Sequence, residues 1–230
     1  MEKLEKETLE LDFFGKKYIF KRLNPFTVRI SREKSHSIAS FSGELVVDTE
    51  KEFYGKPYLI KFKENQYLSP NSMLKLFLKL PLVTKLVLKN DKKSMEIDRH
   101  IEYNRVTWHG EVHRGVVCTY VEAEFAFDNP FETLDALVPL RIVNKSHVPV
   151  DISKIFVEPE NLFLFKGDNG NFTNKVYILV ISSNDFSVEY STKTTNKAVN
   201  PQPIIDRKIS VARTVLTRFD KFGIARELGL

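Results

Sequence analysis

Residues 74–80 of this chain read Leu-Lys-Leu-Phe-Leu-Lys-Leu, with a leucine at every second position. A similar alternation runs through residues 117–127, where Val, Thr, Ala and Phe at odd positions are interleaved with residues that include Glu122 and Glu124. Successive side chains of a β-strand point to opposite faces, so a period of two separates a core face from an outer face. The sequence therefore predicts a mainly β protein of antiparallel β-sandwich type, with one α-helix at the C-terminus.

Composition limits the classes of protein that this chain can belong to. Hydrophobic residues make up 42% of its 230 residues, which is enough for a core and argues against disorder. Nine glycines argue against Gly-rich phosphate loops. The single cysteine, Cys118, excludes an internal disulfide framework and a Cys-based zinc site. We expect no cofactor.

The N-terminal residues Met-Glu-Lys-Leu-Glu-Lys-Glu carry charges where a signal peptide has an apolar run. Lysines also interrupt the Leu-rich residues 73–88, so no segment is apolar for long enough to span a bilayer. These features predict a cytoplasmic protein without a transmembrane segment, and the high Lys and Glu content is typical of thermophiles.

Changes in pattern along the chain predict three parts. Alternation stops at residues 128–133, Asp-Asn-Pro-Phe-Glu-Thr, where Asn-Pro indicates a turn. We expect an N-terminal β domain over residues 1–130, a smaller C-terminal β-sandwich over 131–205, and an amphipathic helix over 206–230. Within the first part, Pro81 predicts either a break between strands at residues 73–80 and 83–89 or a bulge or sheet edge, because proline cannot donate to a β-ladder.

Helical spacing is the signature of the last part. Apolar residues fall three or four positions apart, and basic residues such as Arg218 occupy the remaining surface: the stripe is Val211, Val215, Phe219 and Phe222. A stripe of this kind most often packs on a sheet and closes a core. A basic amphipathic helix can instead dock a partner protein or a membrane surface, so these five residues are the candidate partner-binding residues.

The strongest candidate for chemistry is the segment Trp108-His109-Gly110-Glu111-Val112-His113. If it forms one strand, then His109, Glu111 and His113 lie on one face, and His100 could join them from the preceding segment. Two imidazoles and a carboxylate are suitable ligands for zinc, iron or manganese. The alternative is a polar, solvent-facing strand, and a glycine at the centre weakens the shared face. No standard nucleophile, nucleotide or metalloprotease motif is present.

Aromatic residues and lysines alternate at residues 53–63, a mixture that can stack bases and contact phosphates. The same mixture describes an ordinary strand with buried rings and outward lysines, and the stretch contains no arginine. The ordinary strand is the better interpretation, so nucleic acid is not the expected partner.

The residues Val138-Pro139-Leu140-Arg141-Ile142-Val143-Asn144-Lys145-Ser146, followed by Val148-Pro149-Val150-Asp151-Ile152-Ser153-Lys154-Ile155, form a recognisable pattern. This pattern resembles the strand–turn–strand of a family of archaeal and bacterial proteins known only as a domain of unknown function. The resemblance implies a prokaryotic cytoplasmic β protein and carries over no catalytic residue.

We therefore expect a non-enzymatic binding or assembly protein. It would use sheet faces, sheet edges or the C-terminal helix to contact another protein or a second copy of itself. The alternative is a metal-binding protein or metal-dependent enzyme that uses the His/Glu cluster.

Overall fold

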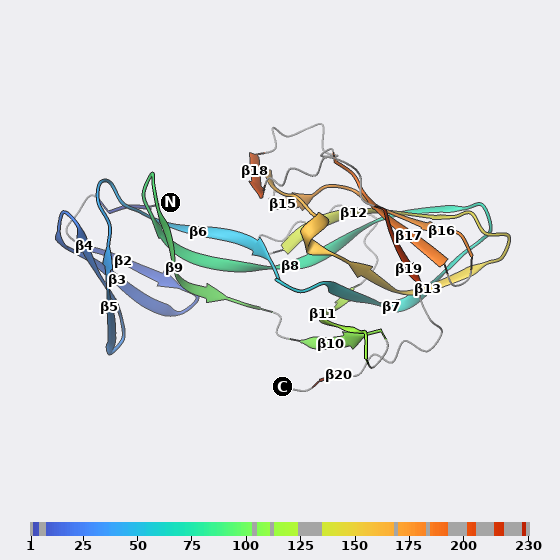
Figure 1. Cartoon of the computed structure of the whole chain (residues 1–230), viewed down its shortest axis with the longest axis horizontal. Helices are drawn as coiled ribbons and strands as arrows, with labels where there is room; N and C mark the ends of the chain where they lie inside the picture. Colours follow the sequence, from blue (N-terminus) through green and yellow to red (C-terminus); the bar gives the residue numbers. More distant parts are fainter. Residues whose placement is uncertain are drawn as a thin grey trace. The chain divides into compact units, whose positions relative to one another are not determined.

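The structure is a computed structural model, shown in Figure 1. It describes residues 2–4, 8–102, 105–110, 113–123, 135–167, 170–182, 185–192, 202–205, 214–218 and 227–228. The chain is mainly β, as its alternation predicts. It divides into two compact units, one formed by Met1–Glu52 and Val83–Ile101, and the other by Phe53–Leu82 and Glu102–Leu230. Residues 128–133, where the sequence predicts a domain boundary, lie outside the described residues.

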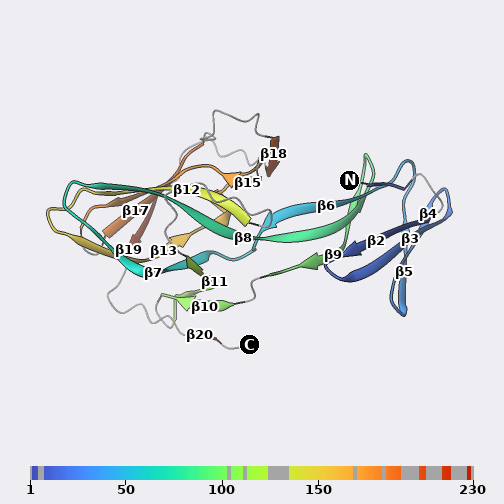
Figure 2. The ribbon, with the colours of Figure 1, turned by 180° about the vertical axis from the view of Figure 1, so that it is seen from behind.

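Unit 1 contains a four-stranded antiparallel sheet, drawn in blue in Figures 1 and 2. Its strands follow one another in sequence and in space, because short turns join neighbours. The turn at Phe14-Gly15 has positive φ at both residues, the geometry that two-residue hairpins require. The strands are β2 (Thr8–Phe13), β3 (Lys16–Asn24), β4 (Thr27–Arg32) and β5 (Ser35–Ser40).

A second layer of unit 1 is formed by β1 (Glu2–Lys3), β6 (Val46–Phe53), residues 83–89 of β8 (Met73–Lys89) and β9 (Ser94–His100). Apolar side chains of both layers form one core, because alternate residues of each strand point inward. The four-stranded sheet contributes Tyr18, Phe20, Val28 and Ile30, and the second layer contributes Val47, Leu86 and Leu88, together with Leu45 just before β6.

Unit 2 contains a five-stranded sheet with the order β13-β7-β11-β10-β20. Its members are β7 (Tyr58–Leu68), β10 (Val106–His109), β11 (Val116–Ala123), β13 (Val150–Val157) and β20 (Glu227–Leu228). The strands β7 and β11 pair in parallel, so this sheet is mixed rather than purely antiparallel as predicted.

The remaining strands of unit 2 are organised around β12 (Asp135–Asn144). One edge of β12 pairs antiparallel with β8, and its other edge pairs in parallel first with β15 and then with β16. The outer members are β14 (Leu164–Gly167), β15 (Gly170–Thr173), β16 (Val176–Val180), β17 (Asp185–Tyr190), β18 (Gln202–Ile205) and β19 (Thr214–Arg218). A one-turn 3-10 helix, Pro159–Asn161, precedes β14.

The strand β8 passes through both units without the break that Pro81 predicts. Pro81 lies opposite Asp135, the first residue of β12, so the missing N–H falls at the end of that ladder. Its carbonyl accepts a hydrogen bond from the buried Tyr58 hydroxyl at 2.9 Å. The proline is tolerated because β8 changes partner here, from β12 to β9.

The predicted C-terminal helix is wrong over residues 214–218. These residues form β19, which pairs antiparallel with β17, and Val215 lies opposite Val188. Within the described residues the structure contains no α-helix. Val215 and Arg218 are therefore strand residues, whereas Val211, Phe219 and Phe222 lie outside the described residues. A helical docking surface is not supported.

Two buried asparagines connect loops of unit 2 to its strands. The Asn144 amide donates to the carbonyls of Leu68, Ser69 and Val148 at 2.9–3.1 Å, and its oxygen accepts from Ser146. Asn174, which separates β15 from β16, bonds the backbone of residues 161, 163 and 191 in the same manner. Each side chain satisfies several backbone groups that burial would otherwise leave without partners.

A polar cluster joins the two layers of unit 1. The Asp98 carboxylate accepts hydrogen bonds from Lys16 Nζ at 2.7 Å and from the Tyr18 hydroxyl at 2.5 Å. Burial raises the pKa of Asp98, but the bonds from Lys16, Tyr18 and the Arg99 backbone N–H outweigh it. The pKa is therefore lower than the ordinary aspartate value of 3.8.

We predict that Asn144→Ala lowers the free energy of unfolding of unit 2 by about 2–4 kcal/mol, since it leaves several buried carbonyls without donors. Chemical denaturation measures the change. The matched control is Asn65→Ala, because Asn65 is exposed and its amide donates to the Asp151 carboxylate rather than to buried carbonyls. It should cost about 0.5 kcal/mol or less. Equal losses for the two variants would contradict the proposed role of Asn144.

We also predict that acid removes the stabilisation provided by Asp98. A carboxylate with a lowered pKa stabilises the folded state above its unfolded-state pKa, and this contribution disappears as the pH falls through the folded-state value. Denaturation of unit 1 measured from neutral pH to below about pH 4 should show this loss, and Asp98→Asn should flatten it. Asp151→Asn, in unit 2, serves as the control. An unchanged acid profile for Asp98→Asn would refute this explanation.

Candidate functional site

The structure separates the residues of the predicted metal cluster. His109 ends β10, and Gly110 follows with φ +104°, so the strand does not continue to His113 as predicted. A side chain at Gly110 would also collide with the backbone of Gly115, 2.9 Å away. Glu111 lies outside the described residues and His113 lies in an exposed turn.

His100 belongs to β9 of unit 1 and stacks on Phe14, with ring centroids 3.7 Å apart. His109 and His113 belong to unit 2. Among the residues that the structure describes, no three His, Cys, Asp or Glu side chains gather closely enough to hold a metal ion.

His109 has an environment that favours its neutral form. The ring stacks on Phe156 of β13, with centroids 5.2 Å apart and planes inclined by 26°. Partial burial lowers the pKa of His109, and the Lys154 ammonium lowers it further. A neutral imidazole can ligate a metal, but the same lysine charge that lowers the pKa also repels a bound cation.

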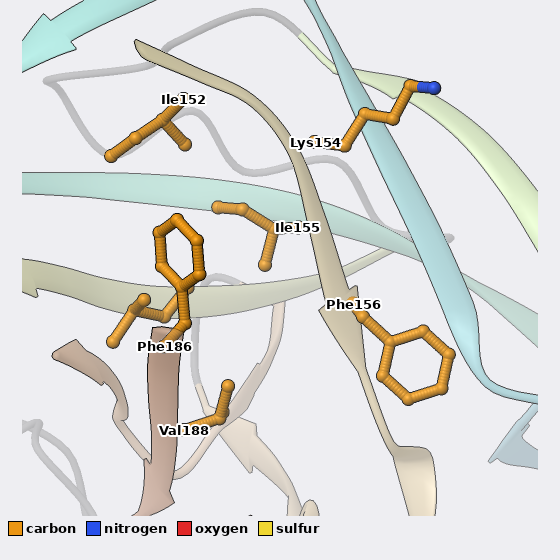
Figure 3. A pocket seen from close by; sticks show the side chains of 7 residues that line it. Ile152, Lys154, Ile155, Phe156, Phe186 and Val188 are labelled. Atoms are coloured by element: carbon orange, nitrogen blue, oxygen red, sulfur yellow. The ribbon is translucent and has the colours of Figure 1, made fainter. Parts of the chain in front are cut away.

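A small apolar cavity lies beside β13 and β17 in unit 2. Figure 3 shows Ile155, Phe186 and Val188 around it, while the Lys154 ammonium points away. Its volume is about 10 Å³, which is at most the space of a single water molecule. Lys154 is the one titratable residue that lines it, and its ammonium points away, so this cavity offers neither the room nor a cluster of groups for catalysis.

The Cys118 thiol is not a reactive nucleophile. It is buried in β11, and burial raises its pKa to about 12. A thiol with this pKa remains protonated near neutral pH and reacts poorly. Cys118 is a small core residue, as its place in an alternating strand indicates.

The outer face of the four-stranded sheet is a more informative surface. We use this name for the side of β3, β4 and β5 opposite the unit 1 core. Ile19 and Leu23 on β3 are 39% and 40% exposed, and Ile38 on β5 is 62% exposed. Lys21, Arg29 and Ile38 lie side by side in one cross-strand row. Apolar and basic side chains thus share this face.

The charge of this sheet is strongly positive. Residues 8–40 contain seven Lys or Arg and three Asp or Glu, a formal net charge of +4, against +5 for the entire chain. Within the described part of the chain, neither Lys21 nor Arg29 takes part in an ion pair.

The lysines of the second layer of unit 1 differ. Lys85 contacts Glu52 and Glu96 at 2.5 and 3.2 Å, and Lys89 contacts Asp48 and Glu50 at 2.8 and 3.0 Å. Unlike these lysines, Lys21 and Arg29 of the outer face have no ion-pair partner among the residues that the structure describes.

Sequence reasoning missed the outer face because β3 reads as an ordinary alternating strand. Tyr18 and Phe20 form its buried phase, so Ile19 occupies a position where a polar residue is expected. In β5, Ile38 similarly stands out of phase with the buried Ala39. An apolar residue in the polar phase of two strands, β3 and β5, on either side of β4 is the signal that could have located this surface.

A family model described as "Protein of unknown function (DUF432)" matches residues 47–220. The chain belongs to the DUF432 family. This bears out the resemblance seen at residues 138–155, which lie within the match. The DUF432 match begins in β6, so the four-stranded sheet precedes it. No curated protein and no solved structure matches the chain. None of the described residues form a helix long and apolar enough to cross a membrane.

We predict that the purified protein contains no stoichiometric zinc, iron or manganese, because β10 ends before Glu111 and Lys154 repels a cation near His109. Elemental analysis after dialysis tests this prediction directly. The control is His113→Ala, which should have the same metal content as the unaltered protein. A stoichiometric metal that disappears in His113→Ala would instead establish the metal-binding alternative.

Proposed function

We propose that the protein is a non-enzymatic cytoplasmic binding protein that holds an acidic partner protein on the outer face of its four-stranded sheet. The observation that carries the proposal is the exposure of Ile19 and Ile38 beside Lys21 and Arg29, two cations that form no ion pair with the described residues. A protein-binding surface usually has apolar anchors at its centre and a polar rim.

The energetics of this face favour association. Removal of an isoleucine side chain from water stabilises a complex by up to about 1.5–3 kcal/mol, so Ile19 and Ile38 can contribute affinity. Lys21 and Arg29 lie in the same row as Ile38 and would accelerate the approach of an acidic partner and select its orientation.

The chemistry of the outer face supports a protein partner over nucleic acid. Isoleucine and leucine, rather than aromatic rings, occupy the exposed apolar positions of β3 and β5. Stacking on aromatic rings is the main sequence-independent interaction with single-stranded nucleic acid. Self-association through this face would bring two sheets of charge +4 together, so a second copy is disfavoured.

A site-specific photocrosslinker in the native host tests the proposal. We expect a photoreactive residue at position 38 to form one defined adduct with an acidic protein, and the same adduct should form from position 19. A photoreactive residue at Tyr67, which is highly exposed in unit 2, is the control and should not form it.

Charge reversal distinguishes an adduct that depends on Lys21 and Arg29 from nonspecific crosslinking. Lys21→Glu combined with Arg29→Glu should remove the adduct, whereas Lys56→Glu combined with Lys61→Glu, at exposed positions of unit 2, should preserve it. Adducts that form equally from all three positions, or that survive the Lys21 and Arg29 reversal, would contradict the proposal.

A further inference from the structure

The strand β5 has a free edge of unusual composition. It pairs with β4 on one side, and no described strand pairs with the other. Its sequence, Ser-His-Ser-Ile-Ala-Ser, contains no Lys, Arg, Asp, Glu or Pro, and its register with β4 has no bulge. Charges, prolines and bulges are the features that normally prevent an edge from pairing with another chain.

Other edges of the described sheets have such protection. Charged residues occur in β1, β2, β9, β13, β19 and β20, and Pro203 lies in β18. The ladders of β9 and β13 also contain register shifts. In the part of the chain that the structure describes, β5 is thus the edge strand without charge, proline or bulge.

The hydrogen-bond pattern identifies the backbone groups that face outward. Phe41 N donates to Phe26 O at 2.9 Å, so this pair is hydrogen-bonded. Along an antiparallel ladder, residue pairs that exchange backbone hydrogen bonds alternate with pairs that do not. Counting from Phe26 and Phe41, the pair of Arg29 and Ile38 is one that does not. The two-residue loop between β4 and β5 leads to the same assignment, because the pair that closes such a loop exchanges backbone hydrogen bonds. The N–H and C=O groups of His36 and Ile38 therefore point away from β4.

We propose that an extended acidic segment of the partner protein adds to β5 as a fifth strand. Backbone pairing with His36 and Ile38 would supply affinity, as in other cases of strand addition. This inference rests on the proposed function and adds the mode of binding and the chemistry of the bound segment.

Charge and spacing favour an acidic, alternating segment. Neighbouring strands lie about 4.8 Å apart, so a residue opposite Ile38 would stand about 10 Å from the Arg29 backbone. An extended arginine and a glutamate side chain span this distance together. Acidic residues would therefore meet Arg29 on the outer face, beside an apolar contact with Ile38.

A randomised peptide library presented to the full-length protein provides the test. We expect the selected peptides to alternate acidic and β-branched residues. When one such peptide binds the unaltered protein, hydrogen exchange of the His36 and Ile38 amides should slow, because both amides face solvent in the free edge. This measurement needs no variant and so does not depend on how a substitution affects folding.

His36→Pro supplies the complementary test. It removes one outward N–H without removing a bond to β4, and should weaken peptide binding about tenfold or more. The matched control, His36→Ala, retains the N–H and should weaken binding by about threefold or less.

The outcomes separate the two proposals. Peptides that depend on Lys21 and Arg29, but neither protect the β5 amides nor respond to His36→Pro, would overturn strand addition and leave the proposed function intact. A library that gives no peptide dependent on Lys21 and Arg29 would overturn both.

Discussion

Alternate side chains of one long strand contribute to two separate hydrophobic cores, and the rest of the architecture depends on this arrangement. Leu76, Leu78 and Leu80 of β8 lie in the core of unit 2, whereas Leu86 and Leu88 of the same strand lie in the core of unit 1. The partner of β8 changes from β12 to β9 close to Pro81, where a ladder bond is missing in any case. Strand alternation is maintained on both sides of this change.

Charged side chains have two distinct uses in unit 1. On the second layer, carboxylates of neighbouring strands form ion pairs with Lys85 and Lys89 and neutralise their charges. On the four-stranded sheet, Lys21 and Arg29 lie beside exposed isoleucines, and no carboxylate in the described part of the chain pairs with them. The two surfaces of unit 1 therefore differ in how far carboxylates of the described chain neutralise their cations. In unit 2, the cavity is too small to hold a substrate. The buried Cys118 thiol has too high a pKa to react readily near neutral pH.

Much of the β structure could be predicted from sequence because alternation is a local property. The strands at residues 17–22 and 27–32 show this, and so does the strand at 74–80. Parallel pairing of β7 with β11 could not be predicted, because it depends on contacts between segments more than fifty residues apart. The helix predicted over residues 214–218 was wrong for a related reason. Their apolar spacing is helical, but Thr214, Val215 and Thr217 are β-branched, and pairing with β17 decided their conformation. At the candidate metal site, the positive φ of Gly110 ended the strand that the shared face required.

Hydrogen exchange of two matched variants tests the central claim, that β8 contributes to two separate cores. Leu78 and Leu88 are both fully buried, so each Leu→Ala substitution should cost about 2–5 kcal/mol. We predict that Leu88→Ala accelerates amide exchange in β3 and β4 by about thirtyfold or more and leaves β12 and β16 protected, and that Leu78→Ala has the opposite effect. Equal loss of protection in both units from either substitution would contradict the account.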